Sequence, residues 1–415
     1  MKERTRAAVT LAGCCGAIFW PGAFIFSLPG IMGDYWQTAF SVGRGEVGRT
    51  MFFVLAGAGT FMFMVGKWQE RVGPKRMVAV GALLCGGSTL LLGRAHGIQA
   101  VWAWAYAVGT SSAFVYIPAL TVAQLWYPQR RGLASGLVNL SFGLSAAVMA
   151  PAFGKLLSTV GPKGMTALVG SLALVIGLGV SPWIQRPGRT RVGTPSSSKP
   201  WDAPSRSLTV TESLRTRAFW GLWLTWALAG AAGISMVTMA TSFAGARGLA
   251  AGEGVFLLTA FNLTNGTSRV VSGYLSDRIG RRIVMSIAFG GAGIAYALMS
   301  FVHGLALWSV MAAMVGFAFG TLFSVSAPLA SERFGMQHFG AIFGLIFTAY
   351  GFLAGILGPW VSGHILDVTQ ENYTLAFGYL GAFFLAPAVL IHLVGPVPRT
   401  PIPVSPSDRG LDMGK

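Results

Sequence analysis

Arg269 is a charged residue deep within an apolar stretch over residues 252–276. It lies about eight residues from the nearer end of that stretch, which is about 12 Å at 1.5 Å per helical residue. None of the 13 acidic residues falls in the core of such a stretch, except Glu253 at the far edge of this one. A guanidinium can bind a carboxylate through two parallel hydrogen bonds. These residue types therefore predict that Arg269 binds an anion from outside the chain.

Two asparagines share one face of the predicted helix with Arg269. At about 100° per residue, Asn262, Asn265 and Arg269 fall within one stripe. Asparagine amides can orient a carboxylate or a hydroxyl, but they also form hydrogen bonds between helices, so both interpretations stay open. For Arg269 the alternative is a packing role in which it binds backbone carbonyls or water. Other polar side chains near the middle of apolar stretches are Tyr116, Asn139 and Tyr350.

The composition excludes an ordinary soluble protein. The 415 residues are 53% hydrophobic and 10% charged, whereas a soluble domain has about 25% charged residues. The net charge of +17 could indicate nucleic-acid binding, but the basic residues form short clusters between long apolar runs, which is typical of membrane proteins. The three cysteines lie in apolar runs, and the sequence shows no catalytic constellation. We therefore expect no nucleic-acid partner, disulfide, metal site, cofactor or enzymatic activity.

Twelve apolar stretches are long enough to cross a bilayer as helices, which takes about 20 residues. We therefore predict an all-α membrane protein with twelve transmembrane helices. The stretches cover residues 8–32, 46–66, 77–95, 98–125, 132–157, 164–185, 218–245, 252–276, 283–302, 305–331, 338–366 and 374–395.

A polar segment divides the twelve stretches into two sets of six. Residues 186–217 are rich in Pro, Ser, Lys and Arg and predict a cytoplasmic linker. The predicted domains are a bundle over 1–185, this linker, a bundle over 218–398 and a cytoplasmic tail over 399–415. With both termini in the cytoplasm, most of the 30 lysines and arginines lie on the cytoplasmic side, as the positive-inside rule requires. We expect a multi-pass protein of a bacterial inner membrane.

The two halves repeat each other at a nearly constant offset. The segment that begins at Gly66 recurs at Gly273, 207 residues later, with an acidic residue and an arginine in register. Gly132 and Gly136 recur as Gly340 and Gly344, 208 residues later. A duplicated six-helix unit predicts two pseudo-symmetric bundles that rock about a central site. The paired glycines favour close helix packing.

Several segments resemble a known family. The loops at Gly66–Arg76 and Gly273–Arg282 resemble the G-x-x-x-[D/E]-R-x-G loop motif of the major facilitator superfamily. The remaining matches resemble its monocarboxylate transporter and oxalate–formate antiporter branch. They are Tyr116 with Pro118, Trp126-Tyr127-Pro128, Arg131 through Gly136, Phe142-Gly143, Phe219-Trp220, Asn265 through Arg269, and Phe319-Gly320 with Pro328.

This resemblance implies a substrate site and a cytoplasmic gate. The alternative for the gate is a set of charges that serves only topology. The predicted substrate-binding residues are Arg269, Asn265, Asn262, Tyr116, Tyr350, Asn139, Phe347 and Phe323, with Phe317 and Phe319 as further apolar walls. The predicted gating residues are Glu70, Arg71, Asp277, Arg278 and Arg131.

The chain departs from the family at two points. Oxalate exchangers carry a second cation, a lysine, where this chain has Tyr350, so one arginine suits a single carboxylate. Proton-coupled members hold a membrane carboxylate, and the seventh stretch has none. We predict a monomeric secondary transporter for a small monocarboxylate such as lactate, pyruvate or formate, working by proton symport or anion exchange. An exporter of drugs or other organic solutes is the alternative, although cationic substrates would need membrane carboxylates.

Overall fold

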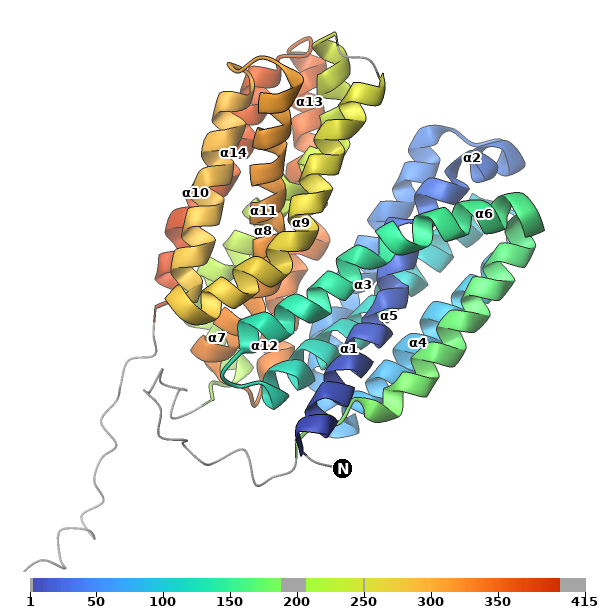
Figure 1. The fold of residues 1–415 in the computed structure, drawn as a ribbon, viewed down its shortest axis with the longest axis vertical. Helices are drawn as coiled ribbons and strands as arrows, with labels where there is room; N and C mark the ends of the chain where they lie inside the picture. The colour runs from blue at the N-terminus through green and yellow to red at the C-terminus, as the bar shows by residue number, and fades with distance from the viewer. Residues whose placement is uncertain (1–2, 188–206, 249–250, 396–415) are drawn as a thin grey trace, which may run out of the picture.

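A computed structural model of the chain describes residues 3–187, 207–248 and 251–395, and the described parts are almost entirely helical (Figure 1). The predicted linker and tail therefore lie largely outside the described residues. The first half contains α1 (Glu3–Phe26), α2 (Leu28–Phe40), α3 (Arg44–Val72), α4 (Pro74–Leu92), α5 (Ile98–Trp126) and α6 (Arg131–Val180). The second contains α7 (Val210–Leu214), α8 (Arg217–Ala246), α9 (Ala251–Ile279), α10 (Arg281–Met299), α11 (Leu305–Phe334), α12 (Phe339–Thr348), α13 (Val361–Val368) and α14 (Tyr373–Leu390).

The twelve-helix fold is confirmed, although apolarity alone identifies fewer crossings. Among the described residues, ten segments are long and apolar enough to span a membrane. One of them, Arg131–Trp183, is α6 and comprises two crossings joined at Gly161, whose φ of 70° breaks the helical path just before Pro162. The other missing crossing is α9, which carries Arg269 and a row of Asn, Ser and Thr residues that lower its hydropathy. The polar residues of the candidate site are thus also the reason why hydropathy alone does not identify α9 as a membrane span.

Two of the predicted stretches are built differently in the structure. The first stretch bends after Phe26, and its continuation α2 covers most of the loop expected before residue 46. The stretch over residues 338–366 is α12 and α13 joined by two π-helical segments, 349–354 and 356–360. Pro359 explains part of that irregularity, because it cannot donate a backbone hydrogen bond. Before α8, Thr209 and Glu212 form a capping box at the start of α7.

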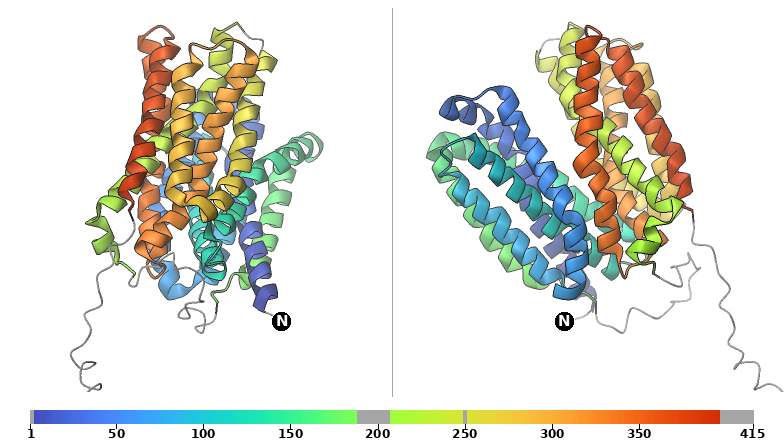
Figure 2. Two further views of the ribbon diagram at one scale, coloured as in Figure 1. Left: turned by 60° about the vertical axis from the view of Figure 1, so that its left-hand side comes forward. Right: turned by 180° about the vertical axis from the view of Figure 1, so that it is seen from behind.

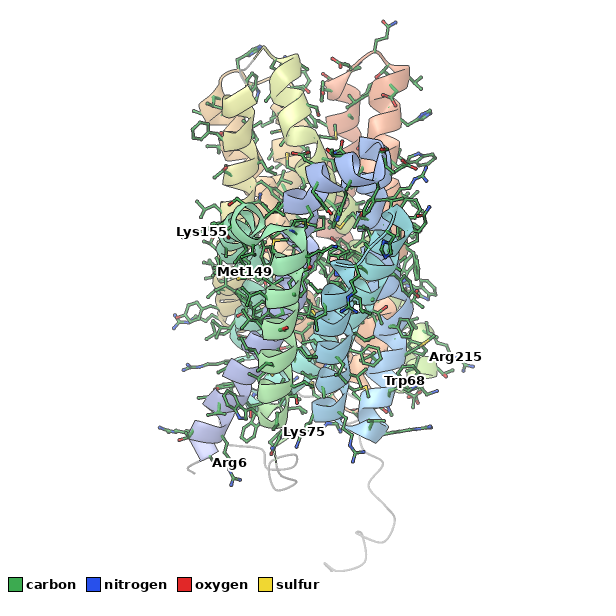
Figure 3. All side chains as sticks on the ribbon, turned by 90° about the vertical axis from the view of Figure 1, so that its right-hand side faces the viewer. Arg6, Trp68, Lys75, Met149, Lys155 and Arg215 are labelled. Atoms are coloured by element: carbon green, nitrogen blue, oxygen red, sulfur yellow. The ribbon has the colours of Figure 1, made fainter. Side chains whose placement is uncertain are left out.

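The helices form two bundles, α1–α6 and α8–α14, that meet at one end and diverge at the other (Figures 1 and 2). The start of α1 and the end of α14 lie at the closed end, which we call the terminal end; the opposite end is the open end. Arg6, Lys75 and Arg215 lie toward the terminal end, whereas Lys155 lies toward the open end (Figure 3). The two bundles therefore diverge away from the end at which α1 begins and α14 ends.

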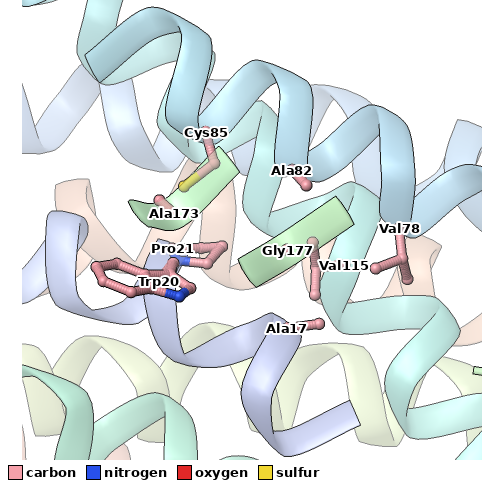
Figure 4. A pocket seen from close by; sticks show the side chains of 9 residues that line it. All are labelled: Ala17, Trp20, Pro21, Val78, Ala82, Cys85, Val115, Ala173 and Gly177. Atoms are coloured by element: carbon pink, nitrogen blue, oxygen red, sulfur yellow. The ribbon is translucent and has the colours of Figure 1, made fainter. Parts of the chain in front are cut away.

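A small pocket inside the first bundle offers no anion site. Its lining is apolar apart from the Cys85 thiol and the Trp20 indole, and none of its side chains is charged (Figure 4). The lining residues are Ala17, Trp20, Pro21, Val78, Ala82, Cys85, Val115, Ala173 and Gly177.

Candidate anion-binding site

Glycines bring the two bundles into backbone contact on the terminal side of Arg269. A Cβ atom on Gly132 would clash with the carbonyl of Gly273, and one on Gly136 would clash with the carbonyl of Arg269. The second contact between the bundles joins α3 to α12 through Gly66 and Gly340 in the same way. Small residues allow such close approach of membrane helices. The repeated glycines therefore pack across the boundary between the bundles, as their spacing predicted.

Arg269 lies where α6 and α9 begin to separate. Its side chain is 2% exposed, and its Nη1 donates to the carbonyl of Asn139 at 2.8 Å. The side-chain oxygen of Asn265 accepts from Nε at 3.4 Å and from Nη2 at 3.3 Å. A Cβ on Gly143 would lie 3.1 Å from Arg269 Cζ, so the guanidinium fills the space that this glycine leaves open.

The surroundings of the guanidinium are neutral. Its Cζ lies 5.0 Å from the ring centroid of Phe323, over which a cation is attracted to the ring's π electrons. Within the described part of the chain, no carboxylate forms an ion pair with Arg269, and the ion pairs of Glu70, Asp277 and Glu332 are made with other residues. A charge buried in a bilayer without a counter-ion is costly, by at least about 2.5–3.5 kcal/mol on insertion scales. An anion entering between the bundles would supply the missing charge.

Asn139 connects the two bundles at the level of Arg269. The hydroxyl of Tyr116 donates to its side-chain oxygen at 2.9 Å. Its Nδ2 donates to the carbonyl of Phe323 in α11 at 3.1 Å and to that of Ser135 at 2.9 Å. Together with the bond from Arg269 to its own carbonyl, Asn139 is hydrogen-bonded to α9 and α11 of the second bundle. The candidate anion site therefore also holds the bundles together.

Aromatic rings form the rest of the site. Phe323, Phe347 and Tyr350 lie in mutual contact, with ring centroids 5.4–6.5 Å apart. The ring of Tyr116 is 5.9 Å from that of Phe347, so the cluster crosses from α5 to α12. Trp226 in α8 contacts the same cluster, at 5.0 Å from Phe323 and 4.9 Å from Phe347. Such walls suit the carbon chain of a small organic acid.

The structure gathers most of the predicted substrate residues but leaves two at the margin. Asn262 is exposed and lies one turn beyond Asn265 toward the open end. Phe317 is half-buried without a ring contact to the cluster. Sequence reasoning missed Trp226 and the space left by Gly143. Trp226 stands in an apolar run that also holds Trp220 and Trp223, and nothing in the spacing distinguishes one from another.

Asp277 links α9 to α6 at the terminal end. Its two carboxylate oxygens accept from the backbone N–H groups of Gly132 and Leu133, at 3.0 Å each. These are free donors at the start of α6, where the helix dipole also favours a negative charge. Arg281 lies 3.2 Å from Asp277 and 2.6 Å from Glu332 of α11. An acidic residue among arginines thus meets a helix N-terminus, as expected.

The other half of the predicted gate is built differently. Glu70 Oε1 lies 3.1 Å from Nδ1 of His338, at the start of α12, and no sequence signal had selected that histidine. Arg131 reaches the Ser331 hydroxyl at 3.4 Å. Arg71 is exposed, and Arg278 is exposed and stacks over Tyr274 of its own helix, so neither contributes a cross-bundle contact among the described residues. The gating role of all five residues stays a prediction.

We expect Asp277→Asn to loosen the start of α6. The variant keeps the side-chain shape but loses the charge and one of two acceptors, so the Gly132 and Leu133 amides should exchange hydrogen about fivefold to tenfold faster, equivalent to about 1 kcal/mol. Hydrogen–deuterium exchange with mass spectrometry measures this directly. Asp34→Asn, which alters an exposed carboxylate in α2, is the control. Equal exchange in all three proteins would show that Asp277 does not hold the two bundles together.

The chain is similar to one large family along nearly its whole length. A sequence profile described as "Major Facilitator Superfamily" matches residues 9–359 and 248–411. The oxalate:formate antiporter of Oxalobacter formigenes is 25% identical over 353 residues, covering 83% of this chain and 82% of the antiporter. Monocarboxylate transporter 13 of Rattus norvegicus is 27% identical and covers 78% of this chain and 74% of its own. An agnestins efflux protein of Paecilomyces divaricatus is 21% identical over 93% and 85%.

A solved structure shares the fold. FucP, the fucose:proton symporter of E. coli, solved in the outward conformation, matches with a TM-score of 0.71 at 16% identity, covering 94% of this chain and 99% of that one. This likeness concerns the fold and carries no information on the substrate.

Proposed function

Because the chain belongs to the Major Facilitator Superfamily, we propose that it carries a small monocarboxylate across the membrane by alternating access, with Arg269 as the anion-binding group. The proposal starts from the fact that members of this family are membrane transporters and not enzymes. The relatives named for oxalate, formate and monocarboxylates support an organic anion as the substrate. The proposal adds that the substrate has one carboxylate and binds between the bundles.

The observation that carries this proposal is the neutral environment of a buried guanidinium. Arg269 is 2% exposed and finds only uncharged partners among the described residues. An anion of charge −1 would make the site neutral, and a guanidinium can bind a carboxylate with two hydrogen bonds. A dicarboxylate would bring a second charge into the aromatic cluster, where Tyr350 stands in place of a cation. A second carboxylate is therefore disfavoured.

The distribution of basic residues supports one direction of opening. The positive-inside rule would place the terminal end, with Arg6 and Lys75, in the cytoplasm. The open end then faces outward, so the described state would admit substrate from outside the cell. Rocking of the two bundles would next separate α6 from α9 and α3 from α12 at the terminal end, releasing the anion inward.

Counterflow into proteoliposomes tests the proposal. Vesicles loaded with unlabelled L-lactate, pyruvate, propionate, formate or oxalate are diluted into the labelled acid at pH 6.0 and pH 7.5. We expect accumulation of at least one monocarboxylate and much weaker accumulation of oxalate. Faster net uptake at pH 6.0, with proton entry, would indicate symport, whereas exchange alone at both values would indicate antiport. Accumulation of organic cations but of no carboxylate would overturn the proposal in favour of an exporter.

Asn139→Leu is expected to let the carrier change between its two states more easily when no substrate is bound. The variant keeps the approximate size of the side chain but loses the Nδ2 bond to the Phe323 carbonyl, which holds the empty bundles together. The empty carrier should then return more easily, raising the ratio of net efflux to exchange about fivefold, which corresponds to about 1 kcal/mol. Paired efflux and exchange assays measure the ratio.

Ser145→Ala is the matched control for that experiment. It removes a hydrogen bond of α6 that stays within the helix, from Ser145 Oγ to the Phe142 carbonyl. An unchanged ratio in Asn139→Leu, or an equal rise in both variants, would show that the cross-bundle bond does not limit the return of the empty carrier.

A further inference from the structure

Trp226 carries a hydrogen-bond donor that the protein leaves unused. Its side chain in α8 is 0% exposed, and its indole Nε1 has no hydrogen-bond partner among the residues that the structure describes. Within the described ranges, it is the only tryptophan with a buried and unpartnered indole nitrogen. The neighbouring Trp223 donates to the Thr348 hydroxyl at 3.3 Å, and Trp220 donates to the Leu214 carbonyl at 2.9 Å. Leaving a buried donor unpaired costs free energy, so such a group calls for a reason.

The unused donor lies beside the candidate anion site. Trp226 is nine residues from the start of α8 and Arg269 ten residues from the end of α9, so both lie about 14–15 Å from the terminal end. Phe323 touches both, with its ring centroid 5.0 Å from Arg269 Cζ and 5.0 Å from the Trp226 ring. The indole and the guanidinium are therefore both neighbours of the same phenylalanine ring.

Tyr350 adds a second neutral polar group to the same region. Its ring lies 5.8 Å from that of Trp226. Both groups are neutral, and the rings around them are Phe323, Phe347 and Phe319. A second carboxylate here would be a buried charge without a cation, whereas a neutral oxygen would satisfy the indole donor at little cost.

We propose that Trp226 is a specificity-determining residue whose indole N–H donates to a neutral oxygen of the substrate away from the carboxylate that Arg269 binds. This inference rests on the proposed function. The favoured substrates are then small monocarboxylates with a hydroxyl or oxo oxygen, whereas acids of the same size without that oxygen leave the indole unpaired. Sites that form hydrogen bonds with a substrate group discriminate against analogues that lack it.

The test compares two acids of nearly equal size in the same vesicles. L-lactate carries a hydroxyl that propionate lacks, so the wild-type protein should have a half-saturation concentration for lactate about tenfold below that for propionate. In Trp226→Phe the ratio of the half-saturation concentration for propionate to that for lactate should fall to about two or less. The variant keeps an aromatic ring but lacks the indole N–H donor. Trp223→Phe, which alters a tryptophan already paired with Thr348, should keep the wild-type ratio.

A second substitution separates the lost donor from lost packing. Replacing Trp226 with 3-benzothienylalanine keeps the two-ring shape and exchanges the N–H for sulfur, so it should give the same low ratio as Trp226→Phe. A wild-type ratio near one, or a ratio that survives both substitutions, overturns this inference while leaving monocarboxylate transport in place. Failure of the wild-type protein to transport either acid would instead refute the proposed function.

Discussion

Arg269→Ala is expected to reduce monocarboxylate counterflow by at least about a hundredfold. The variant removes the one cation that the described residues place in the candidate site and up to two charge-assisted hydrogen bonds to the substrate, each worth about 1.5–3 kcal/mol. The substrate carboxylate would then enter an apolar cluster of Phe323, Phe347 and Tyr350 without a counter-charge. Initial rates of labelled L-lactate counterflow measure the loss.

Two further variants make the result interpretable. Arg269→Lys keeps the charge but presents a single ammonium in place of the planar fork, so we expect a partial loss of about tenfold or more. Arg49→Ala removes an exposed arginine that lies over Trp102 and should transport normally. Size-exclusion profiles and thermal unfolding show whether each variant is folded. Normal counterflow in a folded Arg269→Ala protein would exclude the carboxylate-binding role.

Gly136→Val is expected to reduce transport by more than about tenfold, because it disturbs the contact between the bundles at the terminal end. Gly136 packs against the carbonyl of Arg269 on the neighbouring helix, and any Cβ there would clash with that backbone. The bundles would have to separate at the terminal end, so the described closed arrangement would be disfavoured. The site residues themselves keep their identity, and counterflow of L-lactate measures the effect.

Gly154→Val on the same helix is the matched control. A Cβ at Gly154 has no neighbour within 4 Å, so this substitution imposes the same intrinsic cost on the helix without a clash. A labelling reagent applied from the terminal side should modify a Ser276→Cys probe faster in Gly136→Val than in Gly154→Val, because Ser276 faces Gly132 across the closed boundary. Equal labelling and equal transport in both variants would show that the glycine contact does not govern closure.

Most of the fold could be predicted because the bilayer imposes simple rules on the sequence. Runs of about 20 apolar residues and the 207-residue repeat specify twelve helices in two similar bundles. The bend at Gly161 and the π-helical segment around Pro359 could not be placed, because they depend on how neighbouring helices pack. The extension of α2 beyond the first stretch was missed because its sequence is less apolar than a membrane span.

The chemistry of the site was partly visible in the sequence. A lone arginine in an apolar helix is conspicuous, and its helical stripe identifies Asn265. The cross-bundle role of Asn139 was not visible, because its partners, the Phe323 carbonyl and the Arg269 guanidinium, belong to helices far away in the sequence. His338 and Trp226 were missed for the same reason: their importance lies in a neighbour, Glu70, and in a missing partner for an indole nitrogen.

The most direct test of the account is a high-resolution structure of the purified protein in saturating L-lactate. We expect density for the acid between α6 and α9, with both carboxylate oxygens within hydrogen-bonding distance of the Arg269 guanidinium and at least one bond from Arg269 to Asn139 or Asn265 exchanged for a bond to the ligand. Density for lactate elsewhere, with Arg269 still bonded to Asn139 and Asn265 as in the empty protein, would contradict the central claim.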